Sequence, residues 1–191
     1  MANRDTPMGL RPAVGISKNH VEMLFPIDSS NGTNVFIGDV VVANAAGSVR
    51  PAAANDGTSV VGAVVALYDS NKIPLASWAS STSTRYLATS TAGYALVALG
   101  LPGAVFIGQV QTGQTPAATS IFATTDHVAG SGNTTTGVSG HELNFSDLNT
   151  GGQFLILGLV DEPNNSWAEH ADIYVSFNES LFAGSGKATG V

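Results

Sequence analysis

The chain has 191 residues, a net charge of −7 and no cysteine, which excludes disulfides, thiolate metal sites and cysteine nucleophiles. Charged residues make up only 11% of it, less than half of the roughly 25% usual for soluble domains, and its 22 glycines are well above the usual share. The seven basic residues are scattered along the chain and outnumbered by fourteen acidic ones, so nucleic-acid binding is not expected.

The first residues contain Pro7, Gly9, Pro12 and Gly15 and show little hydrophobic periodicity. Proline removes a backbone donor and forces the preceding residue toward extended geometry. The pattern therefore predicts an extended N-terminal arm over residues 1–20. Such an arm can be loose as a chain end and become ordered on a partner. No positively charged segment followed by an apolar one opens the chain, so we expect no secretory signal.

From residue 21 to residue 182, apolar residues come in short bursts that are rich in Val and Ile and bounded by turn-forming residues, which is typical of strands. The predicted strands are Val21–Pro26, Val35–Asn44, Val60–Asp69, Arg85–Thr89, Tyr94–Leu99, Gly103–Thr112, Ile121–Ala123, Glu142–Phe145, Phe154–Glu162 and Ile173–Asn178. One short helical turn is predicted over Ile73–Ser81. Strands at this spacing, without βαβ alternation, predict an all-β body that is an antiparallel β-barrel or β-sandwich.

Two hexapeptides within these strands resemble each other, VFIGDV at 35–40 and VFIGQV at 105–110. A glycine inside a strand is typical of a bulge or a sharp bend, so we predict bends at Gly38 and Gly108. Nothing beyond the hexapeptide repeats, and two unrelated strands are therefore favoured over an internal duplication.

The longest apolar run, Tyr94–Gly108, is interrupted by Gly100, Pro102 and Gly103. It is shorter than the ~20 residues that a membrane helix needs, so it predicts two strands and a turn. No membrane partner is expected.

Two glycine-rich segments resemble nucleotide-binding loops but lack the required residues. The sequence around Gly184–Lys187 ends like a P-loop, although Leu181 and Ala188 replace the required Gly and Ser or Thr. Gly130–Gly132 begins like a dinucleotide loop but has no third glycine. We therefore predict no cofactor, and a flexible tail over residues 183–191.

Three of the four histidines stand beside an acid, in Asp126-His127, His141-Glu142 and Glu169-His170. Adjacent residues on a strand point to opposite faces, so no pair converges on a metal by itself. A site built from members of different pairs stays open, but solvated or core-edge histidines are favoured and no metal is predicted. The chain also has no Gly-x-Ser-x-Gly elbow and no recognisable acid/base pair, so no catalytic residue is assigned and no enzyme is expected.

Three segments resemble proteins of tailed-phage heads: MANRDTPMGLRP at 1–12, VFIGDVVV at 35–42 and HVAGSGNTTTGVSGHEL at 127–143. They cover roughly a fifth of the chain and are similar to segments of capsid decoration, or cement, proteins. The sequence departs from that pattern between Ile16 and Phe25 and over Leu67–Ser83. The matching positions are Asn3, Arg4, Thr6, Pro7, Gly9, Leu10, Pro12, Gly38, Asp39, Gly130, Gly132, Thr134–Gly137 and Ser139–Gly140.

The resemblance implies a structural protein on the outer capsid surface of a virion, made in the host's bacterial cytoplasm. The implied partners are the major capsid protein and further copies of the chain, with a trimer favoured over a dimer. Deleting residues 2–15 is predicted to leave the body folded and to weaken these contacts. The candidate capsid or subunit contacts are Asn3, Arg4, Thr6, Pro7, Leu10, Arg11 and Pro12.

Two other functions stay open. A glycan- or receptor-binding β module on a virion surface needs exposed aromatic faces, for which Trp78 and Trp167 in loop-like segments are the better candidates. Each of them equally suits a subunit interface. A virion-associated hydrolase is the third hypothesis, and the missing catalytic constellation argues against it.

Overall fold

The computed structural model describes residues 3–13, 15, 20–44, 47–53, 56, 60–75, 84–149 and 151–182. The predicted all-β fold is confirmed over these residues. They contain one 3-10 helix, η1 (Ala118–Ser120), and no helix long and apolar enough to cross a membrane. The strands are β1 (Arg11–Pro12), β2 (Glu22–Ile27), β3 (Val40–Ala43), β4 (Val49–Pro51), β5 (Val60–Tyr68), β6 (Gly93–Leu99), β7 (Val105–Gln109), β8 (Thr124–Val128), β9 (Glu142–Asn149), β10 (Phe154–Leu159) and β11 (Asp172–Phe177).

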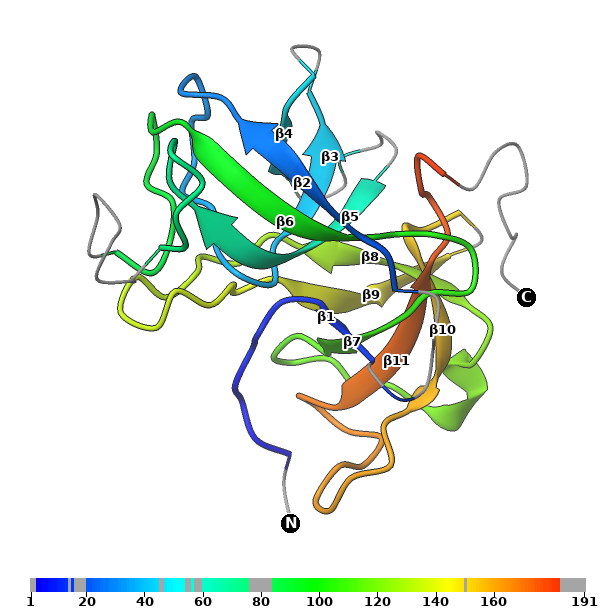
Figure 1. Ribbon diagram of the computed structural model, residues 1–191. Helices are drawn as coiled ribbons and strands as arrows, with labels where there is room; N and C mark the ends of the chain where they lie inside the picture. The colour runs from blue at the N-terminus through cyan, green and yellow to red at the C-terminus, as the bar shows by residue number, and fades with distance from the viewer. Residues whose placement is uncertain are drawn as a thin grey trace.

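The described strands form two antiparallel sheets that pack together (Figure 1). Sheet I has the order β1-β7-β11-β10-β8-β9, and sheet II has the order β2-β6-β5-β3-β4. Sheet I curls on itself, because Val110 just after β7 forms a bridge with Leu143 of β9. The Gln111 N–H also donates to the Leu143 carbonyl over 3.1 Å. Sheet II curls too, and Cα atoms of β2 and β4 lie within 8 Å of each other.

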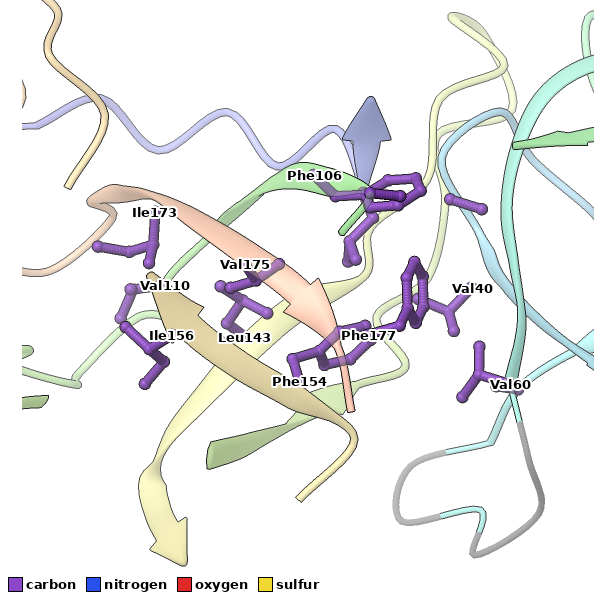
Figure 2. Packing of buried hydrophobic residues seen from close by; sticks show 14 of the residues in the cluster. Val40, Val60, Phe106, Val110, Leu143, Phe154, Ile156, Ile173, Val175 and Phe177 are labelled. Atoms are coloured by element: carbon purple, nitrogen blue, oxygen red, sulfur yellow. The ribbon is translucent and has the colours of Figure 1, made fainter. Parts of the chain in front are cut away.

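The largest core cluster lies inside sheet I and extends to sheet II (Figure 2). The ring of Phe177 lies 4.7 Å from that of Phe106 and 5.0 Å from that of Phe154, centroid to centroid. Val40 and Val60 reach this cluster from sheet II, and both are fully buried. Burial of these large side chains supplies the main favourable term for packing the two sheets.

Strand alternation explains which side chains enter the core. In β11, Ile173, Val175 and Phe177 are buried and alternate with half-buried Asp172, Tyr174 and Ser176. This period of two is the pattern from which the strand was predicted. A second apolar cluster is built mainly from strands of sheet II, and it contains Ile27, Val35, Val41, Val49, Val61, Val64, Leu67, Leu87, Ala95, Val97 and Leu99.

The strand predictions differ from the structure at several places. Strand β4 was not predicted, and of the predicted Val35–Asn44 only β3 is a strand, with isolated bridges at Val35 and Ile37. Arg85–Thr89 contributes an isolated bridge, between Leu87 and Val35. Ile121–Ala123 is not a strand, and β8 begins directly after it. The sequence of β8, TTDHV, lacks an apolar burst, yet the side chains of Thr124 and Thr125 are fully buried. Their hydroxyls satisfy backbone groups, since Thr124 Oγ1 accepts from the Gly152 N–H and Thr125 Oγ1 donates to the Asn144 carbonyl.

The remaining local predictions have mixed outcomes. The bend at Gly38 is present, with φ +94, whereas Gly108 lies in an uninterrupted β7. The beginning of the predicted helical turn is instead a bridge between Pro74 and Tyr68. Residues 76–81 of that turn, Trp78 and the predicted tail at 183–191 lie outside the described residues.

Candidate interaction site

Residues 3–13, here called the N-terminal segment, are extended and lie against the body (Figure 1). The Leu10 side chain is only 1% exposed and belongs to the main core cluster. Its N–H donates to the Gly38 carbonyl over 2.8 Å, and the Ala13 N–H donates to the Val105 carbonyl over 2.9 Å. Between these two points β1 pairs with β7. Residues 3–13 of the predicted arm are therefore integrated into the fold of their own chain.

The beginning of the segment is held by two amide side chains. Gln109, which is 5% exposed, donates from Nε2 to the Arg4 carbonyl and accepts at Oε1 from the Thr6 N–H, each over 3.0 Å. Asn3 donates from Nδ2 to the carbonyls of Ser166 and Glu169, each over 2.9 Å. No sequence pattern predicted a role for Gln109, whose only signal was a polar residue at the end of an apolar strand.

An exposed ion pair adds little to this attachment. Arg11 and Asp172 approach to 3.2 Å, with side chains that are 39% and 27% exposed. Burial raises the pKa of Asp172, and the Arg11 guanidinium opposes that shift. Pairs in such a setting typically contribute about 0–1 kcal/mol, so the backbone contacts and Leu10 hold the segment.

The structure separates the predicted contact residues into two groups. The Arg4 and Thr6 side chains are exposed and available to a partner, and Pro7 is half-buried. Met8, which was not predicted, is 46% exposed. The residues that bind the chain's own body are Asn3, Leu10, Arg11 and Pro12.

The loop at 129–141 is also docked on the body. The Ile37 N–H donates to the Gly137 carbonyl over 3.0 Å, and the Ser139 N–H donates to the Ile37 carbonyl over 2.8 Å. Because Leu10 binds Gly38 next to this point, the three segments that carry the family resemblance meet around Gly38.

A cleft of about 630 Å³ opens beside this loop, between residues 33–36, 50–53 and 129–132. Asp39 and His141 line it, although they are only 2% and 4% exposed. Asp39 Oδ2 accepts from the Phe36 N–H over 2.8 Å, and His141 Nδ1 accepts from the Val40 N–H over 3.3 Å. Since Nδ1 accepts, the neutral His141 ring carries its proton on Nε2, which lies 3.6 Å from Asp39 Oδ1.

Burial shifts both groups toward their neutral forms. It raises the pKa of Asp39 to about 6, against opposing hydrogen bonds from Ser139 and from the Phe36 N–H. It lowers the pKa of His141 to about 3, and the neighbouring His127 adds to that shift. Ser139 Oγ accepts a hydrogen bond from the backbone N–H of His141. Among the described residues, the Ser139 hydroxyl forms no hydrogen bond with the His141 ring, the contact that would activate a serine nucleophile.

We expect two single variants of this pair to have opposite pH dependences. In Asp39→Asn, His141 is the member of the pair that still titrates. Its lowered pKa leaves the free energy of unfolding at its full value above pH 6.5 and reduces it as the pH falls toward about 3. In His141→Gln, Asp39 is the member that still titrates. Its raised pKa leaves the free energy of unfolding at its full value below pH 3.8 and reduces it as the pH rises through about 6. The two effects offset each other in the unmodified chain between about pH 4 and 6.

Urea unfolding midpoints of the unmodified chain and both variants at pH 4, 5, 6 and 7 test this expectation. Relative to the unmodified chain, Asp39→Asn should gain stability and His141→Gln should lose it as the pH rises from 4 to 6. Parallel curves for all three proteins would show that the pair does not titrate in this way.

The other predicted site residues are now placed. His127 and His141 are buried, so the prediction of solvated histidines is wrong for these two. Their rings stack with centroids 5.0 Å apart. Trp167 packs, half-buried, against the main core cluster, so it does not present the exposed face expected for glycan stacking. Residue Trp78 lies outside the described residues.

The cleft and the exposed part of the N-terminal segment are two surfaces that a partner can reach. They come from segments distant in sequence, which meet because both sheets curl around buried clusters. No protein-family model, curated protein or solved structure matches the chain, so its own residues carry the functional inference.

Proposed function

We propose that the chain is a structural virion protein that binds the outer surface of a tailed-phage capsid and stabilises the expanded shell. Its partners are the major capsid protein and further copies of itself, with a trimer favoured. Its low content of charged residues supports this proposal, because a surface with few charges suits a protein that neighbours cover.

The observation that carries the proposal is the apolar edge of sheet II. Among the described strands, β2 lies at the end of the sheet order. Val21, directly before it, is 47% exposed, and Met23 and Leu24 at its start are 50% and 39% exposed. Proteins that stay monomeric usually protect such an edge with charges, prolines or a covering element. Here Glu22, Pro26 and the approach of β4 to β2 provide only partial protection, since the apolar side chains at the start of β2 stay exposed, and this favours a second chain as the cover.

The meeting point around Gly38 gives further support. Met8 and Ile37 stand directly before Gly9 and Gly38, and they are 46% and 39% exposed. The three segments that resemble decoration proteins thus form one contiguous unit that presents apolar side chains.

The proposed mechanism is stabilisation by mass action. A protein that bridges two capsomers contributes its binding free energy only to the shell state in which both seats have the correct spacing. If subunits of an oligomer share one seat, avidity exceeds single-site affinity by about 10²-fold or more without stronger individual contacts.

Co-sedimentation of the purified chain with expanded and unexpanded phage shells tests the proposal. We expect saturable binding at a fixed stoichiometry to expanded shells alone, and loss of at least tenfold in affinity for Met23→Lys and Leu24→Lys, because a lysine on β2 leaves a charge in the apolar interface. Both positions are exposed, so the free energy of unfolding should change by less than about 0.5 kcal/mol.

The matched control is Leu148→Lys, which places the same charge at a 41% exposed leucine of sheet I. It should bind shells like the unmodified chain. Equal binding by all three variants would remove β2 from the interface, and absence of binding to either shell would contradict the proposal as a whole.

A virion-surface glycan- or receptor-binding module is the second candidate, and the 630 Å³ cleft favours it. The aromatic ring in that cleft, Phe36, is only 6% exposed and stacks on Tyr86 at 5.1 Å, so it offers little face to a sugar. A glycan array with the purified chain distinguishes this candidate, since capsid cement requires no glycan binding.

A further inference from the structure

We propose that Asp5, Glu142 and His170 bind a divalent transition-metal cation, which fastens the N-terminal segment to the body. The three residues come from different parts of the chain: the N-terminal segment, the first position of β9 and the loop before β11. One ligand atom from each lies within 4.8 Å of the other two. Glu142 comes from the His141-Glu142 pair and His170 from the Glu169-His170 pair, so members of two different pairs converge. Asp5 adds a carboxylate that the sequence pattern did not connect to them.

The orientation of His170 suits metal binding. Its Nε2 lies 3.0 Å from Glu169 Oε1, an ion-pair contact that favours a proton on this ring nitrogen. Nδ1 then keeps its lone pair, and Asp5 Oδ1 lies 3.7 Å from it. A carboxylate on the other ring nitrogen is the common partner of metal-binding histidines, because it holds the tautomer and the ring in place.

Two atoms of the cluster lack the partner that a cation would supply. Glu142 Oε1 and His170 Nδ1 are both buried from solvent, and among the described residues neither has a hydrogen-bond partner. Both belong to residues whose ligand atoms gather with the Asp5 carboxylate within 4.8 Å of one another. Buried acceptors without a donor are rare in folded proteins, and a positive ion at their centre satisfies all three together.

The ligand set indicates the class of cation. One imidazole nitrogen with two carboxylate oxygens suits Zn²⁺ or Mn²⁺ better than Ca²⁺ or Mg²⁺, which prefer oxygen ligands alone. At ligand distances of about 2.1 Å, neighbouring ligand atoms of a tetrahedral site lie about 3.4 Å apart, so the three atoms, which now lie within 4.8 Å of one another, must approach by about 1 Å. The Asp5 side chain is 60% exposed and has the freedom to make it.

Such a cation would hold the segment where its backbone is already bound. Asp5 stands between Arg4 and Thr6, and Gln109 binds the backbone of both neighbours. Metal binding would connect this part of the segment directly to β9 and to the loop before β11. The exposed Arg4 and Thr6 side chains would then be presented in one conformation.

Calorimetric titration of the full chain, dialysed against a chelator and then against metal-free buffer, tests the site with Zn²⁺ and Mn²⁺. We expect one saturable site per chain, and at least tenfold weaker binding by His170→Asn and Glu142→Gln. Glu169→Gln should weaken binding about tenfold through the orientation of His170. Glu162→Gln, at an exposed carboxylate outside the cluster, is the control and should bind like the unmodified chain.

Two measurements on the unmodified chain keep the test independent of how the variants fold. In histidine ¹⁵N spectra, Zn²⁺ should shift the Nδ1 signal of His170 and leave those of His20, His127 and His141 unchanged. Amide exchange of residues 3–10 should slow at least tenfold in the presence of the metal. Absence of saturable binding of both cations, a shift of another histidine instead, or unchanged affinity in a folded His170→Asn would overturn the proposal.

Discussion

Replacing Leu10 with alanine should lower the free energy of unfolding by about 3 kcal/mol, within the range of about 2–5 kcal/mol for leucines in cores. Leu10 is 1% exposed and packs in the main core cluster, so the change removes buried methyl groups and leaves a cavity. The expected size is large because the surrounding side chains come from both sheets and cannot all close on the space. Urea unfolding followed by tryptophan fluorescence measures the effect.

Leu181→Ala is the control for this prediction. Leu181 is 52% exposed, so the same chemical change should cost less than about 0.5 kcal/mol. Equal losses for the two variants, or a stable Leu10→Ala protein, would show that the N-terminal segment does not complete the core.

The burial of Leu10 also changes what a deletion would do. The sequence predicts that removing residues 2–15 leaves the body folded, but this change removes Leu10 and β1 together. We now expect the deletion to destabilise the body, so a loss of binding in it would have two explanations. Substitutions at the exposed Arg4 and Thr6 side chains test partner binding without this effect.

Gly9→Ala should be at least as destabilising, by about 3 kcal/mol or more. Gly9 has φ +67, where a side chain costs about 1–2 kcal/mol. A Cβ there would lie 2.1 Å from the Gly38 carbonyl oxygen and 2.7 Å from Ser139 Cβ, and overpacking adds about 1–3 kcal/mol. The Gly38 carbonyl cannot easily withdraw, because it accepts the Leu10 N–H and the Gly38 N–H donates to the Val64 carbonyl.

Gly113→Ala separates the two causes. Gly113 has a similar φ of +79, but a Cβ there would meet nothing within 4 Å. It should therefore cost only the backbone part, about 1–2 kcal/mol, in the same thermal or urea unfolding experiment. If Gly9→Ala costs no more than Gly113→Ala, the close approach of the N-terminal segment to Gly38 is not a rigid contact.

Much of the fold could be predicted from local pattern alone. Strands β5, β6, β10 and β11 were predicted close to their observed positions, because a strand with a buried face has apolar residues at alternate positions or in short runs. β8 was missed, since its buried Thr124 and Thr125 satisfy their hydroxyls through backbone hydrogen bonds rather than through apolar contact. Hydrophobic pattern cannot reveal a strand of this kind.

The sequence by itself determined the all-β class, most strand positions and the extended form of the N-terminal segment, because these depend on neighbouring residues. Only the tertiary structure decided that Leu10 enters the core, that Gln109 binds the segment, and that Asp5, Glu142 and His170 converge. The residues in each of these contacts lie far apart in sequence. Their meeting depends on how the two sheets curl and pair, which is a property of the whole chain that local periodicity does not contain.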